Sequence, residues 1–173
     1  RLLLAVNASF FTPEGKALGL LIDQGKEHQK IRNVDWGVFF VRRDGKAQIV
    51  HTTDFKPDVN IETAIQSGPR LVVSGRPLKL KPQIGRRTAV CIDREERVML
   101  IVTEQAMLLQ SFAELLALAP GQGGLGCAYA LNLDGGSSTQ ATHLLPPKPW
   151  DLYGTSMVPV ALGIQHRSSE VQP

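Results

Sequence analysis

Short apolar segments, each ended by glycine, proline, aspartate or asparagine, follow one another along most of this sequence. Segments of this kind with many β-branched residues are typical of β-strands, and glycine and proline mark the turns between them. The Asp44-Gly45 pair between two such segments is a strong signal for a β-hairpin. We expect strands at the following positions: 2–6, 18–22, 36–42, 48–52, 70–73, 88–92, 98–103, 128–133 and 157–164.

Residues 107–119 have the periodicity of an amphipathic helix. Apolar side chains recur there at helical spacing, and Pro120 ends the run because proline cannot continue a helix. A second, short helix is expected at residues 60–66, ended by Gly68-Pro69. The polar tail, Arg167 to Pro173, is expected to be frayed.

The strand at 98–103, the helix at 107–119 and the strand at 128–133 form a predicted β-α-β unit. If both strands belong to one sheet, they run parallel and the crossover is right-handed. The pattern as a whole predicts an α+β fold with a mixed β-sheet core, hairpins, one main helix in the β-α-β unit and one short helix. No internal repeat or linker divides the chain, so we expect residues 1–173 to form a single domain.

Composition excludes several classes of protein. The net charge of +3 is spread along the chain and forms no basic stripe, so no nucleic-acid partner is expected. No apolar run is long enough to span a membrane. The histidines and cysteines have no metal-ligand spacing, so we expect no metal and no other cofactor. Cys91 and Cys127, both in apolar segments, are predicted to be buried free thiols, with a disulfide as the alternative.

The most informative stretch follows the predicted strand at 128–133 and runs Asn132-Leu133-Asp134-Gly135-Gly136-Ser137-Ser138. It places a carboxylate at the end of a strand, where ligand sites are common in sheets with crossover connections. The two glycines let the backbone turn sharply, and their N–H groups can line an anion-binding nest. The hydroxyls suit phosphate or sugar oxygens. A plain Asp-Gly turn explains the same residues, so both interpretations stay open.

Three further stretches contain candidate binding groups. The stretch Arg86-Arg87-Thr88 can present a guanidinium to phosphate, because the planar fork of arginine donates parallel hydrogen bonds. Ser67-Gly68 combines a hydroxyl with a flexible residue, and Asn7 can bond a sugar hydroxyl. Each also has an ordinary explanation, as exposed strand-end arginines or as turn residues.

Taken in order, four stretches resemble the motifs of the phosphodiester glycosidase family. They begin at Asn7-Ala8-Ser9-Phe10-Phe11, Gln66-Ser67-Gly68-Pro69-Arg70-Leu71-Val72, Arg87-Thr88-Ala89 and Asn132-Leu133-Asp134. The resemblance covers about residues 5–166. It also has departures, since Ala8 and Ser9 replace both glycines of the Asn-Gly-Gly that members usually carry, and Ser137 replaces a third glycine of the later motif.

The resemblance implies hydrolysis of the bond between the anomeric carbon of a sugar and phosphate in a sugar-1-phosphodiester, without a catalytic metal. It makes Asp134 the catalytic carboxylate, as nucleophile or as general base, and Arg87 the cation that stabilises the leaving phosphate. The substrate-binding residues would be Asn7, Ser67, Gly68, Thr88, Asn132, Gly135, Gly136, Ser137 and Ser138.

The resemblance also implies export, because bacterial members are often periplasmic or extracellular. We therefore expect an export signal upstream of Arg1 and further strands before the Asn7 motif. The alternative function is a non-catalytic domain that binds a phosphorylated glycan of the envelope or cell wall. A phosphodiesterase that attacks phosphorus is a third interpretation, and it lacks the clustered metal ligands usual for that reaction.

Overall fold

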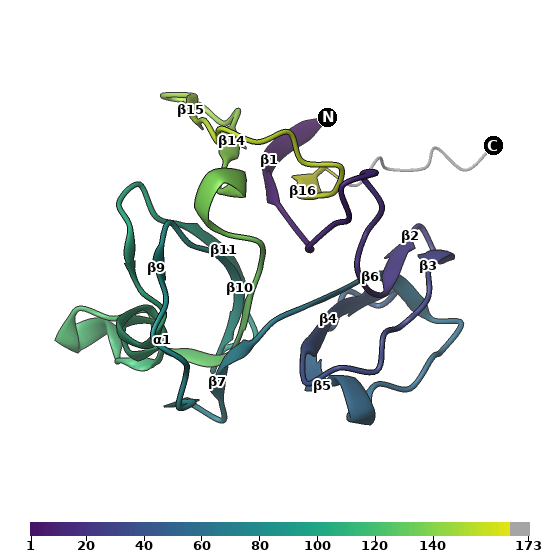
Figure 1. The fold of residues 1–173 in the computed structure, drawn as a ribbon, viewed down its shortest axis with the longest axis horizontal. Helices are drawn as coiled ribbons and strands as arrows, with labels where there is room; N and C mark the ends of the chain where they lie inside the picture. The colour runs from purple at the N-terminus through teal and green to yellow at the C-terminus, as the bar shows by residue number, and fades with distance from the viewer. Residues whose placement is uncertain (167–173) are drawn as a thin grey trace.

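The computed structural model describes residues 1–166 and consists mainly of antiparallel β-sheets with one α-helix in that range (Figure 1). The expected fraying of residues 167–173 lies outside the described residues. One five-stranded sheet, here called the β6 sheet, has the order β3 (Lys26–Gln29), β2 (Leu21–Asp23), β6 (Ile61–Ser67), β4 (Gly37–Arg42) and β5 (Ala47–His51).

The second five-stranded sheet, the β10 sheet, has the order β11 (Val98–Val102), β10 (Thr88–Asp93), β13 (Cys127–Asn132), β7 (Arg70–Val73) and β8 (Arg76–Pro77). A four-stranded β1 sheet has the order β15 (Trp150–Leu152), β14 (Ala141–His143), β1 (Leu2–Asn7) and β16 (Ala161–Gln165). A two-stranded ribbon pairs β12 (Met107–Leu108) with β9 (Ile84–Gly85). Short 3-10 turns occupy Thr52–Asp54, Pro120–Gln122 and Gly136–Ser138.

The α+β class is confirmed, but the expected mixed sheet is wrong. Every strand pair among residues 1–166 is antiparallel. β11 and β13 lie in one sheet and point the same way, but β10 lies between them and pairs antiparallel with both. Hairpins such as β4–β5, around Asp44-Gly45, account for many of these pairs.

The short helix expected at residues 60–66 is also wrong, because this segment forms strand β6. β6 lies in the middle of its sheet, between β2 and β4, so its backbone groups bond to strands on both sides. Ile61, Ala64 and Ile65 are buried there. Long-range pairing therefore overrides the local pattern, as is common for strand-forming segments.

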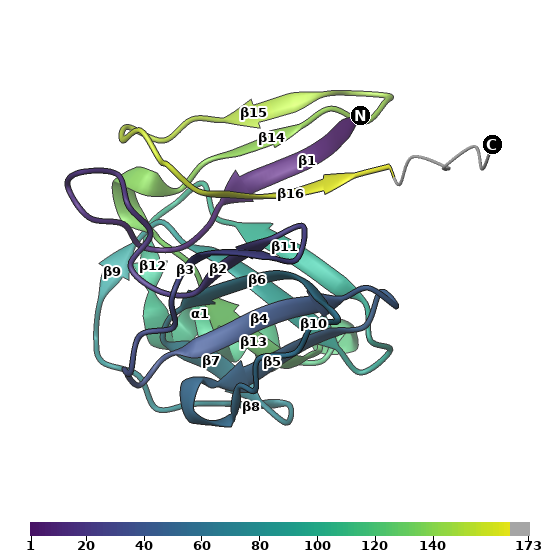
Figure 2. The ribbon, with the colours of Figure 1, turned by 90° about the vertical axis from the view of Figure 1, so that its right-hand side faces the viewer.

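The predicted main helix is present as α1 (Leu109–Ala117). Its buried side chains Leu109, Phe112 and Leu116 pack on one face of the β10 sheet. The other face of the β10 sheet packs against the β6 sheet and the β1 sheet. Figure 2 shows the β1 sheet as a separate layer at the top. No helix in the described range is long and apolar enough to cross a membrane.

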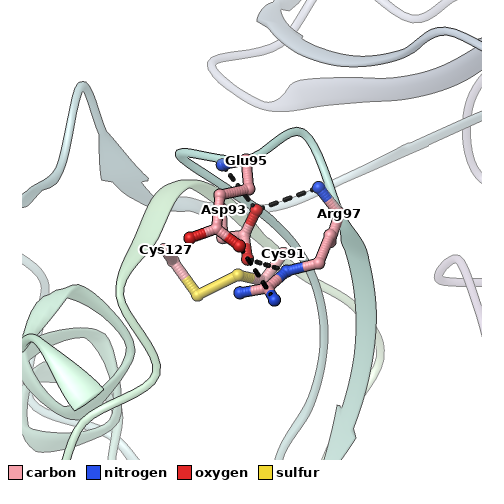
Figure 3. Close-up of a disulfide and its surroundings, with 5 residues drawn as sticks. All are labelled: Cys91, Asp93, Glu95, Arg97 and Cys127. Atoms are coloured by element: carbon pink, nitrogen blue, oxygen red, sulfur yellow. Dashed lines mark hydrogen bonds and ion pairs between the residues drawn. A yellow bond between two sulfur atoms is a disulfide. The ribbon is translucent and has the colours of Figure 1, made fainter.

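Cys91 and Cys127 form a disulfide, which corrects the prediction of free thiols (Figure 3). β10 pairs Asp93 with Cys127, and Cys91 lies two residues before Asp93 on the same side of the strand. The two Cα atoms are therefore 5.8 Å apart, although 36 residues separate them in sequence. The bridge lies in the core beneath α1, beside the hairpin turn in which the Asp93 carboxylate accepts hydrogen bonds from Arg97.

We predict that the double variant Cys91→Ala/Cys127→Ala unfolds with a free energy about 4 kcal/mol lower than the wild type, because the bridge closes a long loop in the unfolded chain. Urea denaturation measures the difference. Dithiothreitol should destabilise the wild type and leave the variant unchanged. If the reductant has no effect on the denatured and refolded wild type, the bridge contributes nothing to stability.

Candidate active site

The four stretches singled out in the sequence come together at one end of the β10 sheet. The N–H of Asp134 donates to the carbonyl of Ala8 over 2.9 Å, which brings the end of β1 to the end of β13. The Asn132 side chain donates to the carbonyl of Gly68 over 2.9 Å, which adds the turn between β6 and β7. Leu133 N–H donates to the carbonyl of Thr88 over 2.8 Å. Three ordinary hydrogen bonds therefore assemble the region.

Arg87 and Asp134 lie opposite each other on neighbouring strands. β10 pairs Ala89 with Asn132, and the bond from Leu133 to Thr88 continues this register toward Arg87 and Asp134. Arg87 and Asp134 lie just outside β10 and β13, and the alternation of the strands continued past their ends would put both side chains on the face of Ala89, where α1 packs. Within residues 1–166 the two side chains form no ion pair with each other.

Asp134 is a half-buried carboxyl group with a raised pKa. Burial raises its pKa, and hydrogen bonds from the Ser138 hydroxyl and the Gly135 N–H oppose this effect. The Gly135 N–H lies 3.0 Å from Asp134 Oδ1. A carboxyl group that is held in place and whose pKa is shifted toward neutrality suits proton transfer or nucleophilic attack.

The turn that follows Asp134 needs its two glycines. Gly136 has a φ of 62°, in the left-handed region, and a Cβ on Gly135 would lie 2.8 Å from the carbonyl oxygen of Arg86. However, the N–H groups of Gly135, Gly136 and Ser138 donate to Asp134 Oδ1, Arg86 O and Gly135 O. These three N–H groups are thus bonded to acceptors of the protein itself. Fewer backbone N–H groups are therefore available to bind an anion than the sequence predicted.

Arg87 is buried, with 3% of its surface exposed, and is bonded mainly to the protein. Of its five N–H groups, four donate to the carbonyls of Gln83 and Met107 and to the Gln83 side chain. No carboxylate within residues 1–166 forms an ion pair with it, and burial lowers its pKa. The guanidinium is therefore fixed on the β9–β12 ribbon, and one Nη1–H is left over.

Within residues 1–166, Arg86 has more N–H donors without a partner than Arg87 has. Its Nη1 donates to the carbonyl of Tyr153 over 3.0 Å, while its Nε and Nη2 are buried and have no partner in the described part of the chain. The loop at 153–156 also holds the glycine turn, because Thr155 N–H donates to the carbonyl of Ser137 over 2.8 Å. The sequence placed Arg86 in a candidate stretch but gave no reason to prefer it over Arg87.

Asn7 and Thr88, predicted to bind substrate, use their polar atoms to hold the site together. Asn7 Nδ2 donates to the carbonyl of Asp134 over 2.6 Å, and Asn7 Oδ1 accepts from the Thr88 hydroxyl over 2.7 Å and from Gln140 N–H over 3.1 Å. Both residues are almost fully buried. Their contacts fix the position of Asp134 relative to β1 and β10.

Ser67, Gly68 and Asn132 lie beside one another, with Gly68 packed on an indole ring. A Cβ on Gly68 would lie 2.6 Å from Trp36 Cδ1, so this position requires glycine. The rings of Trp36 and Phe10 are in contact, with centroids 5.0 Å apart. Sequence reasoning assigned no role to Trp36 or Gln83, because neither lies in a motif and only the fold brings them here.

No group of three or more His, Cys, Asp or Glu side chains in the described range is placed to hold a metal ion. The site consists instead of one carboxyl group, two arginines, a glycine turn and several hydroxyl and amide groups.

The fold has a counterpart among solved structures. It is similar to the solved catalytic domain of zebrafish N-acetylglucosamine-1-phosphodiester alpha-N-acetylglucosaminidase, auto-inhibited by its pro-peptide, with a TM-score of 0.69 and 24% sequence identity. The model of the phosphodiester glycosidase family matches residues 1–165, and the chain belongs to that family. The family resemblance drawn from the four stretches is therefore confirmed.

The chain covers 64% of the zebrafish structure, which in turn matches 96% of this chain. A hypothetical protein from Synechocystis is a more distant match, with a TM-score of 0.49 and 16% identity over 82% of this chain and 47% of that one. A comparison with curated proteins gives no match.

Asn7→Ala should lower the free energy of unfolding by about 3 kcal/mol, roughly 1 kcal/mol for each of the three hydrogen bonds it removes. Thr88→Val removes one of the three and should cost about 1 kcal/mol. Urea denaturation of both variants measures the effect. An Asn7→Ala variant with wild-type stability would show that these bonds do not hold the site together.

The raised pKa of Asp134 predicts a pH-dependent stability. The folded protein binds this proton more tightly than the unfolded chain, so the contribution is fully present below the ordinary aspartate pKa of about 3.9 and is lost as pH rises through the folded value. The free energy of unfolding of the wild type, measured relative to Asp134→Asn, should therefore fall between pH 3 and pH 7. A difference that increases over this range contradicts the raised pKa.

Proposed function

We propose that this protein is a glycoside hydrolase that cleaves the bond between the anomeric carbon and phosphate of a sugar-1-phosphodiester. The observation that carries the proposal is the position of Asp134 across from Arg87, beside the glycine turn, in a chain of the phosphodiester glycosidase family. The zebrafish protein is named for an N-acetylglucosamine-1-phosphodiester, which makes diesters of that sugar the first substrates to test.

The chemistry of the leaving group fits a site with few ionisable residues. Ordinary glycosidases need a carboxylic acid to protonate an alkoxide leaving group, and they pair it with a second carboxylate. A phosphate group has its last pKa near about 6, so it leaves with little protonation. The main requirement is then stabilisation of negative charge on its oxygens, which fixed arginine side chains and hydroxyls supply.

In this proposal the phosphate binds at the glycine turn. Arg86 offers Nε and Nη2, two donors without a partner among residues 1–166, and Arg87 offers its remaining Nη1–H. The exposed Ser137 hydroxyl lies in the same turn. Arg87 also has a positioning role, since its bonds to Gln83 and Met107 hold the β9–β12 ribbon against the site.

Asp134 acts at the anomeric carbon, as a nucleophile or as a general base toward water. The two roles differ in product stereochemistry, because a covalent intermediate retains the anomeric configuration and direct attack by water inverts it. Proton NMR of the first product released distinguishes them.

We also propose a periplasmic or extracellular location. The support is the Cys91–Cys127 bridge, since structural disulfides form and persist in oxidising compartments and are rare in the cytosol of most organisms.

Asp134→Asn should lower the rate of sugar release by about 10²- to 10⁴-fold, because the amide neither accepts a proton nor attacks carbon. Ser111→Ala, on the exposed side of α1, is the matched control and should keep the wild-type rate. In ¹⁸O-labelled water the label should enter the sugar. Label in the phosphate would show attack at phosphorus instead.

A wild-type protein that binds sugar-1-phosphodiesters and hydrolyses none of them would favour the alternative, a glycan-binding domain. The nearly complete hydrogen bonding of Arg87 to the protein is the observation that supports this second candidate.

A further inference from the structure

Three polar atoms in the site are buried and have no hydrogen-bond partner within residues 1–166. They are Ser9 Oγ, Ser67 Oγ and Asn132 Oδ1. The residues are 2%, 0% and 5% exposed. Buried polar groups without partners are rare in folded proteins, and each such group indicates a place for water or a ligand.

The three residues belong to segments that are bonded to one another. Asn132 donates to the carbonyl of Gly68, the neighbour of Ser67, and Asp134 N–H donates to the carbonyl of Ala8, the neighbour of Ser9. Trp36 connects the segment of Ser9 with the segment of Ser67, because it packs against both Phe10 and Gly68. Hydrogen bonds and ring packing therefore hold residues 7–10, 67–69 and 132–134 together next to Asp134.

The hydrogen bonds of Asn132 fix which of its amide atoms is free. Its Nδ2 donates to the carbonyls of Gly68 and Leu133, at 2.9 and 2.7 Å. A flipped amide would set its oxygen against two other oxygens, so the free atom is the acceptor Oδ1. An acceptor needs an O–H or N–H from the ligand. An ionised phosphodiester has neither on its phosphate, whereas a sugar has hydroxyl groups and an N-acetyl sugar also has an amide N–H.

The unpartnered atoms of Arg86 have the opposite character, since Nε and Nη2 are donors only and suit an anion. They lie near the 153–156 loop, where Arg86 bonds Tyr153. Asn132 Oδ1 can only accept and the Arg86 nitrogens can only donate, while the hydroxyls of Ser9 and Ser67 can do both. The acceptor Oδ1 is therefore what sets the first group of atoms apart from the second.

We propose that Ser9, Ser67 and Asn132 form a subsite that binds the sugar, through hydroxyl or amide N–H groups of its ring, while the phosphate lies toward Arg86. This inference rests on the proposed function and gives the substrate a direction in the site. Ser9 would then contribute to specificity for the sugar, because its hydroxyl can both donate and accept a hydrogen bond. The neighbouring Ala8 has no polar side-chain atom and cannot take this role. The three atoms are buried, and the half-buried Phe10–Trp36 pair packs against these segments. The proposal therefore includes a movement of this pair when the sugar binds.

The test uses Trp36 as the reporter. In a Trp150→Phe background, Trp36 is the only tryptophan, because the chain has two. We titrate this protein with glucose, galactose, mannose and N-acetylglucosamine, and separately with inorganic phosphate. At least one neutral sugar should change the fluorescence. Isothermal titration calorimetry measures both affinities independently of Trp36.

Ser9→Ala and Ser67→Ala should each weaken binding of that sugar by about five- to tenfold, the loss of one neutral hydrogen bond, and leave phosphate affinity unchanged. Arg86→Gln should weaken phosphate binding and spare the sugar. Ser111→Ala is the matched control and should change neither. Urea denaturation of each variant verifies that it is folded.

The subsite is wrong if no sugar of the panel binds the wild type, if folded Ser9→Ala and Ser67→Ala bind the sugar as the wild type does, or if they lose phosphate affinity equally. Failure of the proposed function has a different result. A protein that hydrolyses no sugar-1-phosphodiester, and whose sugar binding still depends on Ser9, lacks the activity and keeps the subsite.

Discussion

The pairing of β10 with β13 is the contact on which the rest of this molecule depends. Its register brings Cys91 near Cys127 at one end and sets Arg87 across from Asp134 at the other. One face of this strand pair supports α1, and the other forms the core shared with the β6 and β1 sheets. A shift of β13 by one residue would turn its side chains, Ala130 among them, away from α1 while Ala89 on β10 stayed in place, so stability and site geometry depend on the same register.

The site residues fall into two groups according to whether their hydrogen bonds are met inside the protein. Asn7, Thr88 and most of the Arg87 guanidinium are satisfied by neighbouring segments and therefore hold those segments in place. Ser9, Ser67, Asn132 Oδ1 and two nitrogens of Arg86 have no hydrogen-bond partner in the part of the chain that the structure describes. Folding leaves such groups unpaired at a cost in stability, which is common at sites that bind ligands.

Local sequence predicted the strands with clear turns, such as β7 and β10, and the helix α1, because periodicity and turn residues are local signals. It failed for β6, whose strand form depends on partners on both sides, and it missed β3, whose residues Lys26–Gln29 are all polar. The disulfide was only the alternative to free thiols, because its cysteines are 36 residues apart and meet only through the β10–β13 register.

The candidate site was easier to locate than to interpret. Four short stretches identified which chain segments meet, yet Arg87 and Asn7 were expected to face substrate, and the structure instead bonds them to Gln83, Met107 and Asp134. These partners lie up to 127 residues away in sequence, so no local pattern indicates them. The same holds for Ser9, which a motif comparison describes only as a replaced glycine. Its meaning depends on a buried hydroxyl that has no partner within residues 1–166 and follows the residue bonded to the backbone of Asp134, and that is a property of the folded chain.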